Sequence, residues 1–282
     1  MKKKLLIPIM ILMLALGVGL LFYPDISSWY NGRIHQGLTQ IYNQKIGDMH
    51  QEYIEEHFRR AREHNLALTG ESIKDPFVEG SGAAVPAYTE YLEILNVGGI
   101  MAQIDIPAIG VHLPVFHTTN TAVLDRGIGH IEGTSLPVGG QGTHSVLTGH
   151  SGLVHSRMFT DLEEIVIGDL FFINVLNETL AYEVDRIMVV LPHEVESLRI
   201  TRDADHVTLI TCTPYAINTH RLLVRGTRVP YVQDMRDEID VVTRTLDWRV
   251  VMVICIAVIF LLLLIVFKVK SVSKRRGEEN DI

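Results

Sequence analysis

The stretch Val207-Thr-Leu-Ile-Thr-Cys212 is rich in β-forming residues and ends at a cysteine, and a second such run, Arg221-Leu-Leu-Val224, follows it. A loop over Thr213–His220 joins the two runs. They are therefore predicted to form neighbouring strands, with Cys212 beside Arg221. A thiol next to a fixed cation suits nucleophilic acyl chemistry, because the cation stabilises a thiolate or an oxyanion. The alternative at this point is a buried cysteine and a surface arginine with no chemical role.

Further strands are predicted upstream of this pair. From Ile100 onward, short apolar or alternating runs are bounded by Gly, Pro, Asn and Asp. Few helical segments separate them, so the sequence predicts a mainly β domain built as a barrel or a sandwich. The predicted strands are Met101–Ile106, Val111–Phe116, Ser145–Leu147, Leu170–Val175, Leu180–Leu191, Val207–Thr211 and Arg221–Val229.

The part of the chain before these strands has a helical pattern. Apolar residues recur at helical spacing over Asp25–Leu68, which predicts one or two amphipathic helices. A stretch rich in turn residues follows over Glu71–Pro86 and is interpreted as a long exposed loop, either a linker or a lid. The apolar residues of Tyr88–Leu95 predict one more short helix.

Two uncharged apolar runs, Leu5–Phe22 and Val250–Phe267, each contain 18 residues, the length of a membrane-crossing helix. Lysines at positions 2–4 precede the first run, and a basic tail follows the second. The positive-inside rule then predicts a two-pass protein of the cell membrane with both termini cytoplasmic and the portion between them exported. A cleaved secretory signal is the alternative for the first run.

The formal net charge of the chain is −8. Because both terminal segments are net positive, the exported portion is more acidic still, which argues against binding to nucleic acid. The chain has two cysteines, and Cys255 lies inside the second apolar run. Cys212 is thus the single cysteine of the exported portion, and an unpaired thiol in an exported domain indicates reactivity or intermolecular pairing.

An amide leaving group departs only when it is protonated, so acyl chemistry at Cys212 also needs a proton donor. Among 13 histidines, His150 is distinguished by its place at a predicted strand end before a Gly-containing loop. The surrounding Gly149-His-Ser-Gly-Leu153 partly matches the G-x-S-x-G turn of serine hydrolases, but its last position is leucine and the chain lacks the alternating strands and helices of that fold. His112 and His117 have no further ligands at metal spacing, so no metal is predicted.

Taken together, these motifs resemble the class C, pilin-polymerising sortases of Gram-positive bacteria, from about Gly98 to Tyr231. The residues that carry the resemblance are Thr148-Gly-His150, Thr208-Leu-Ile-Thr-Cys212-Thr-Pro-Tyr215, Ile217-Asn-Thr-His-Arg221-Leu-Leu-Val-Arg-Gly226, Gly99-Ile-Met101, Ile104-Asp-Ile-Pro107, Gly129-His-Ile-Glu-Gly-Thr-Ser-Leu-Pro137 and Phe159-Thr-Asp-Leu162.

The resemblance implies an eight-stranded sortase-type β-barrel with N-terminal helices and two flanking transmembrane helices. It assigns Cys212 as the nucleophile, His150 as the general acid and later base, and Arg221 as the cation that positions substrate and stabilises the oxyanion. Cys212 would cleave an LPXTG-like sorting signal of a pilin between Thr and Gly, and a lysine of the next pilin would resolve the thioester as an isopeptide bond. No cofactor is implied.

Asp75-Pro76-Phe77 resembles the lid motif of class C sortases, whose acid and aromatic residue cover the active site. Phe77 stands where tryptophan is more frequent, and stacking of its smaller ring over Cys212 is expected. Two other positions depart from the family pattern. Ser151 replaces a frequent arginine after the histidine, and Ala216 replaces a frequent glycine.

Two other functions stay open beside pilin polymerisation. A cell-wall-anchoring sortase shares the triad but normally has one membrane segment and no such lid. In a non-catalytic, membrane-tethered binding protein, the triad would be coincidental.

The expected organisation of the chain has six parts. They are an N-terminal transmembrane helix or signal (1–23), N-terminal helices and lid loop (24–97), a catalytic barrel (98–232), a linker helix (233–249), a C-terminal transmembrane helix (250–267) and a cytoplasmic basic tail (268–282).

Overall fold

The computed structural model of the chain describes residues 2–68, 75, 77, 88–153, 156–232 and 235. The chain divides into two compact units, Met1–Ile239 and Asp240–Ile282. The second unit lies outside the described residues, as does nearly all of the predicted linker helix 233–249. The predicted membrane segment 250–267 and the basic tail 268–282 therefore stay predictions.

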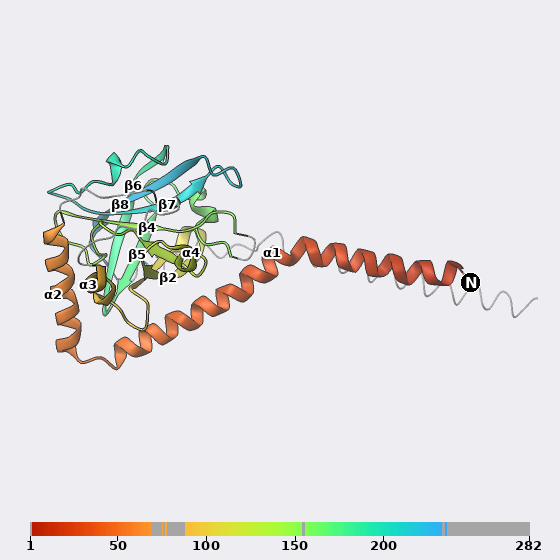
Figure 1. Cartoon of the computed structure of the whole chain (residues 1–282), viewed down its shortest axis with the longest axis horizontal. Helices are drawn as coiled ribbons and strands as arrows, with labels where there is room; N and C mark the ends of the chain where they lie inside the picture. The colour runs from red at the N-terminus through yellow and green to blue at the C-terminus, as the bar shows by residue number, and fades with distance from the viewer. Residues whose placement is uncertain are drawn as a thin grey trace, which may run out of the picture. The chain divides into compact units, whose positions relative to one another are not determined.

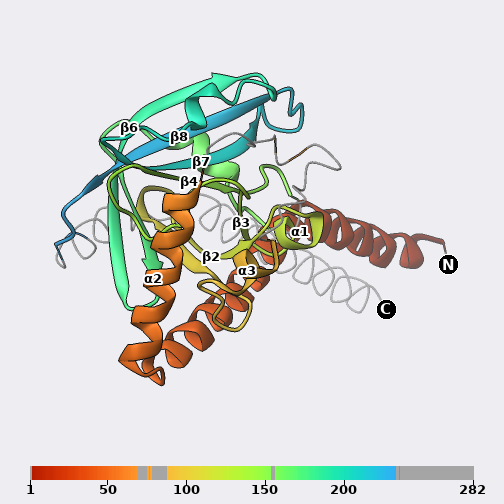
Figure 2. The same cartoon turned by 60° about the vertical axis from the view of Figure 1, so that its left-hand side comes forward.

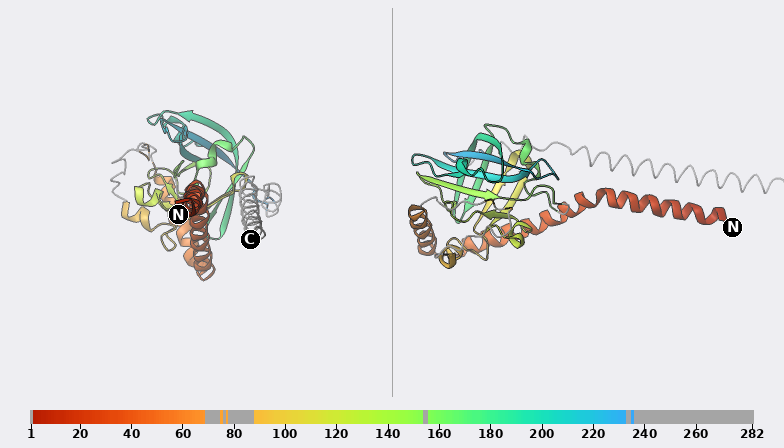
Figure 3. Two further views of the ribbon diagram at one scale, coloured as in Figure 1. Left: turned by 90° about the vertical axis from the view of Figure 1, so that its right-hand side faces the viewer. Right: turned by 45° about the horizontal axis from the view of Figure 1, so that its top comes forward.

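Eight strands close into one barrel, in the order β1-β2-β3-β4-β7-β8-β6-β5. Figure 3 shows the strands from two further directions. Closure removes the exposed edges that an open sheet would present. The predicted mainly β barrel is thus confirmed. The strands are β1 (Ala102–Ile106), β2 (Val111–His117), β3 (Ile128–His130), β4 (Thr143–Thr148), β5 (Leu170–Val175), β6 (Glu178–Val190), β7 (Asp205–Thr213) and β8 (His220–Val229).

The sequence pattern missed one strand, β3. It has only three residues, which is too short to show an alternation of apolar and polar side chains. Gly129 at its centre lies so close to its neighbour that an added Cβ would be 2.5 Å from the Thr118 carbonyl oxygen. The strand therefore depends on close backbone packing, whose only signal in the sequence is a glycine.

Three helices precede the barrel: α1 (Lys2–Gly47), α2 (Gln51–Ala67) and α3 (Tyr88–Glu93), with a short α4 (Thr121–Leu124) between β2 and β3. The predicted helical stretch from Asp25 to Leu68 is confirmed, with a break over residues 48–50, and α1 begins well before Asp25. In the part of the chain with described structure, no helix is long and apolar enough to cross a membrane.

Buried polar side chains of α1 and α2 join the helices to the barrel. Figures 1 and 2 show α2 and α3 beside the strands. Tyr42 of α1 donates its hydroxyl to the Met101 carbonyl at 3.3 Å and accepts the Leu176 N–H at 3.0 Å. The Asn65 side chain of α2 makes two hydrogen bonds to the backbone of Leu136, at 2.7 and 3.1 Å. Because these backbone groups are buried, losing such partners would cost about 1–3 kcal/mol each.

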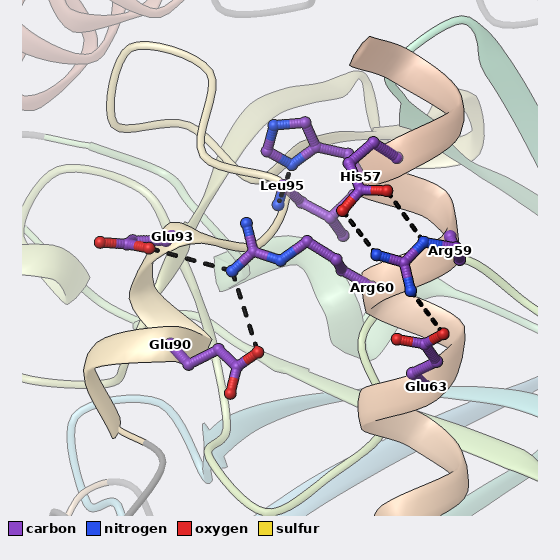
Figure 4. A network of polar contacts seen from close by, with 8 residues as sticks. His57, Arg59, Arg60, Glu63, Glu90, Glu93 and Leu95 are labelled. Atoms are coloured by element: carbon purple, nitrogen blue, oxygen red, sulfur yellow. Dashed lines mark hydrogen bonds and ion pairs between the residues drawn. The ribbon is translucent and has the colours of Figure 1, made fainter. Parts of the chain in front are cut away.

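A polar network connects α2 with α3 (Figure 4). Arg60 lies 3.9 Å from carboxylates of both Glu90 and Glu93, distances typical of weak surface pairs. The buried His57 ring accepts the Leu95 N–H at 3.0 Å, and this satisfies a backbone donor at the end of α3. His57 therefore fixes the approach of the two helices more firmly than the surface charges do.

The barrel wall separates two apolar clusters. Leu147, Leu209 and Val224 point into the main core, which fills the barrel and extends to the N-terminal helices. Since side chains alternate along a strand, their neighbours point to the other face. There Val146, Ile210 and Leu223 form a second, smaller cluster together with Ile131 and Leu198.

Candidate active site

Cys212 and Arg221 lie directly opposite one another on the antiparallel strands β7 and β8. This confirms the predicted placement of the thiol beside the arginine. Counting along β7 by twos puts Cys212 on the same face as Ile210, and Arg221 shares that face with Leu223. Both residues therefore lie at the end of the second apolar cluster, on the outer face of the barrel wall, and Cys212 is a free thiol.

His150 reaches the same place from strand β4, which runs parallel to β7 and pairs Thr148 with Ile210. Two further contacts continue this pairing beyond the end of β4. The Gly149 N–H donates to the Ile210 carbonyl at 3.1 Å, and the Thr211 hydroxyl donates to the Gly149 carbonyl at 2.8 Å. The peptide before His150 is thus held against the residues that precede Cys212.

Asp75 and Phe77 of the predicted lid lie over this group of residues. The Arg221 guanidinium is 5.1 Å from the centre of the Phe77 ring, which is a cation–π distance. The Phe77 and His150 rings have centroids 5.5 Å apart at an interplanar angle of 45°. The ring and cation contacts of Phe77 are thus with His150 and Arg221, and the expected stacking over Cys212 stays a prediction. Pro76 lies outside the described residues.

Asp75 forms a fork-shaped ion pair with Arg221. Nε donates to Oδ1 at 3.0 Å and Nη2 donates to Oδ2 at 2.7 Å, with both side chains less than a tenth exposed. The Phe77 N–H also donates to Asp75 Oδ1, at 3.3 Å. Such a bidentate, poorly hydrated pair is stronger than a surface ion pair.

The other guanidinium nitrogen holds the loop between β7 and β8. Nη1 of Arg221 donates to the carbonyls of Asn218 and His220, each at 3.1 Å. In this arrangement the hydrogen bonds of Arg221 go to the lid and to its own loop. Release of Asp75 would free the Nε donor and one Nη2 donor, together with the positive charge, for an oxyanion formed at Cys212.

The surroundings of Cys212 keep its thiol protonated. Burial raises the pKa of Cys212, the Arg221 cation lowers it, and the Asp75 carboxylate raises it again, with burial the largest cause. The resting site therefore holds a neutral thiol next to an arginine already paired with a carboxylate. Any change that exposes the thiol or removes Asp75 lowers this pKa and favours the nucleophilic thiolate.

The loop from β7 to β8 contains backbone positions of unusual conformation. Ala216 has φ +64° and Asn218 has φ +61°, both in the left-handed region. This region favours glycine, which gives a physical reason for the glycine that the family resemblance leads us to expect at the position of Ala216. The side chain of Tyr215 packs over Gly152, where an added Cβ would be 3.2 Å from the ring, and so the loop contacts the segment after His150.

The other residues weighed as candidate sites have structural roles. A closed barrel is not the α/β fold in which a G-x-S-x-G serine acts, so the partial match at Ser151 has no support. His112 pairs with Asp105 at 2.9 Å, and His117 contacts the Ile94 carbonyl at 2.8 Å. Over the described residues, no group of three or more metal-ligating side chains occurs.

Several residues of the site had no assigned role from sequence. Thr211 is one, since a threonine inside a β-rich run is typical of an ordinary strand. Thr213 and Glu163 are others, because the hydrogen bond of the Thr213 hydroxyl to Glu163 Oε1, at 2.5 Å, joins positions 50 residues apart. A contact at this separation leaves no local pattern, so only the fold reveals it.

Comparison with known proteins agrees with this geometry. Residues 104–229 match the Sortase domain family. Sortase C-1 from Actinomyces oris is similar, with 48% identity over 64% of this chain and 99% of its own, at a TM-score of 0.62. Streptococcus pneumoniae sortase C, a structure described with reference to pilin substrate specificity, has 39% identity over 69% of this chain and 97% of its own, at a TM-score of 0.64. Sortase A of Listeria monocytogenes is 28% identical over 54% of this chain and 68% of its own length.

Proposed function

Because this chain belongs to the sortase family and is a cysteine transpeptidase, we propose that it is the class C enzyme that polymerises pilins. Its substrates are pilin subunits that carry LPXTG-like sorting signals. The enzyme cleaves between Thr and Gly and joins the new carboxyl end to a lysine of the next pilin. Two findings support this assignment: the similarity to sortases C and the lid made by Asp75 and Phe77.

The reaction follows from the three residues at the strand ends. The Cys212 thiolate attacks the Thr–Gly carbonyl, and Arg221 stabilises the oxyanion of the tetrahedral intermediate. His150 gives a proton to the departing Gly amine, which leaves a thioester on Cys212. The pilin lysine then gives a proton to His150 and attacks the thioester carbonyl, so that the isopeptide bond forms as the thiolate departs.

The single observation that carries the pilin assignment is the Asp75–Arg221 pair beneath the Phe77 ring. A lysine amine must attack the thioester before water does, and a cover over the thioester favours the amine by limiting access of water. A cell-wall-anchoring sortase normally lacks this Asp-Pro-aromatic segment. The lid therefore favours polymerisation over wall anchoring, which is the second candidate because sortases A also match the chain.

We also propose that the enzyme acts at the outer surface of the cell membrane. The uncharged runs Leu5–Phe22 and Val250–Phe267 would anchor it, with both termini cytoplasmic and the barrel outside. An exported pilin would meet the active site at that surface. Labelling of single introduced cysteines with a membrane-impermeant maleimide, in a Cys212→Ala/Cys255→Ala background, tests the topology. Labelling of a cysteine introduced at either terminus of the chain, in intact cells, would contradict the proposed topology.

The test of function is mass spectrometry of the purified chain incubated with an LPXTG-type peptide, with and without a pilin acceptor. We expect an acyl adduct on Cys212 that is transferred to a pilin lysine, and none in the Cys212→Ala variant. Transfer only to a cell-wall-type amine would favour anchoring. Transpeptidation retained by folded Cys212→Ala would disprove the cysteine mechanism.

A further inference from the structure

The short 3-10 helix η2 (Thr160–Glu164) and the residue before it, Phe159, hold the segment that contains His150. The Phe159 N–H donates to the His150 carbonyl at 3.1 Å. The Gly152 N–H donates to the Thr160 hydroxyl at 3.1 Å. The Phe159 ring also packs closely on Gly149, where an added Cβ would be 3.0 Å from the ring.

The same helix also holds the segment that contains Cys212. Thr213, the next residue, donates its hydroxyl to Oε1 of Glu163 at 2.5 Å, and Thr213 is only 7% exposed. Because side chains alternate along β7, Thr211 and Thr213 point away from the face of Cys212. The Thr211 hydroxyl donates to the Gly149 carbonyl at 2.8 Å. Both hydroxyls therefore hold the end of β7 from the face opposite to Cys212.

The acceptor in this contact is a carboxylate, which makes the hydrogen bond stronger than one between neutral groups. Glu163 is followed by Glu164, a second exposed glutamate on the same short helix. Within the described residues, the structure shows no hydrogen bond or ion pair for Glu164. The two neighbouring carboxylates therefore differ mainly in the contact to Thr213, which makes Glu164 a matched control.

We propose that Glu163 is a positioning residue for the transpeptidation: through Thr213 it sets where the Cys212 thiol lies relative to His150. The proposal rests on the proposed function, since it concerns the same nucleophile and acid. Proton transfer needs heavy atoms within about 2.6–3.2 Å, and nucleophilic attack needs the reacting atoms about 3–3.5 Å apart. Strand pairing brings the two strand ends together, and η2 with Phe159 contacts both the segment after β4 and the last residue of β7. A displacement of about 1 Å at such a site can cost ~10²-fold in rate.

The first experiment is a double-mutant cycle on the acylation of Cys212 by an LPXTG-type peptide. The parent protein is the whole chain with the lid substitutions Asp75→Ala and Phe77→Ala. We expect Glu163→Ala and Thr213→Val each to lower kcat about 10-fold with KM nearly unchanged. The double variant should lose no more than either single one, because both remove the same contact. Glu163→Gln keeps an acceptor oxygen and should retain most of kcat, and Glu164→Ala should match the parent.

A second readout does not require the peptide to be a substrate. Iodoacetamide alkylation of Cys212 as a function of pH reports the surroundings of the thiol. We expect Glu163→Ala and Thr213→Val to alter the profile alike, while Glu163→Gln and Glu164→Ala leave it unchanged. If the parent fails to cleave the peptide, the proposed function fails, and this profile still decides whether Glu163 positions the thiol.

Three results would overturn the proposal. One is a folded Glu163→Ala variant with parental kcat and alkylation profile. Another is additive losses in the double variant. The third is the same faster alkylation in Glu163→Ala and Glu163→Gln, since that would reveal an effect of charge alone. If Glu163→Ala does not fold, Glu163→Asp, shorter by one methylene, takes its place, and unchanged kcat in that variant would reject the proposal.

Discussion

Asp75 and Arg221 are 146 positions apart in the sequence, yet two parallel hydrogen bonds of 3.0 and 2.7 Å join their side chains. The cation proposed to stabilise the oxyanion is thereby paired with a carboxylate of the same chain. The Phe77 ring covers the pair and contacts His150 as well. Two of the three residues proposed to be catalytic, Arg221 and His150, are thus engaged by one short segment.

The first prediction concerns this lid. Asp75→Ala combined with Phe77→Ala should raise the rate of cleavage of a free LPXTG-type peptide, because Arg221 and His150 become available to substrate. The same change should lower the pKa of Cys212, since Asp75 and burial both raise it. The pH dependence of iodoacetamide alkylation should therefore shift to lower pH.

Two single variants separate the contributions within the lid. Asp75→Asn removes the charge with little change in shape. It should reproduce the part of the shift in the alkylation profile of Cys212 that comes from the charge of Asp75. Asp203→Ala removes an exposed carboxylate elsewhere and should leave both rates at parental values. Unchanged or slower peptide turnover in the double lid variant would argue against a role of this segment in controlling access.

The second prediction concerns Arg221. Lysine keeps the charge at this position but has no fork of donors, so it replaces neither the bidentate bond nor a directed contact to an oxyanion. Arg221→Lys should lower kcat by about 10²- to 10³-fold. Arg225→Lys is the matched control on the same strand, since Arg225 forms a similar fork with Asp185 away from Cys212. Equal losses in the two variants would show that the effect is general destabilisation.

The third prediction is a loss of stability in acid. Burial lowers the pKa of His130 to about 3 and that of His144 to about 4. Both rings stay neutral in the folded protein, while the unfolded chain binds protons below about pH 6.5. The free energy of unfolding should therefore fall as the pH drops from about 6.5 towards 4, by up to ~1.4 kcal/mol per pH unit for each histidine. Glu132, whose pKa burial raises, opposes this trend.

Urea unfolding at a series of pH values measures that slope. His130 is held between the Tyr91 hydroxyl at 3.0 Å and the Ser135 carbonyl at 2.9 Å, so a neutral amide there should reduce the pH dependence. His130→Asn is expected to have a smaller slope than the parent, and the exposed His193→Asn should keep it. An identical slope in all three proteins would mean that other groups control acid unfolding.

The fourth prediction concerns the loop after Cys212. Ala216→Gly should raise stability by a few tenths to about 1 kcal/mol, because the left-handed φ of +64° strains alanine more than glycine. Ala204→Gly is the control, as Ala204 is not among the positive-φ residues and its replacement should lower stability. Thermal melting distinguishes the two, and a lower melting temperature for Ala216→Gly would contradict the strain.

Local sequence pattern was enough to predict the pairing of Cys212 with Arg221. Two β-rich runs joined by a short loop leave few arrangements besides adjacent antiparallel strands, and the observed register places the two residues opposite each other. The pattern did not place His150, because β4 and β7 pair in parallel across a long intervening segment. Its position at a strand end and the family resemblance singled it out.

Contacts between distant segments were beyond the reach of sequence pattern. Nothing in the spacing of Asp75 or Phe77 indicates their partners, and these two residues were proposed only because of their resemblance to a known lid. The role of Thr211 depends on a hydroxyl that reaches the Gly149 carbonyl, 62 positions away. Hydrophobic periodicity predicts which face is buried, and it carries no information about such polar contacts.

The hydroxyl of Tyr42 binds backbone groups of Met101 and Leu176, and Asn65 does the same for Leu136. A shortened protein that starts at Gly98, where the strand pattern begins, would leave these buried groups exposed or without partners. The smallest piece suited to use as a protein-ligation reagent therefore starts ahead of Tyr42. The N-terminal helices stabilise the catalytic barrel, and removing them to simplify production would shorten the time for which the enzyme stays folded and active.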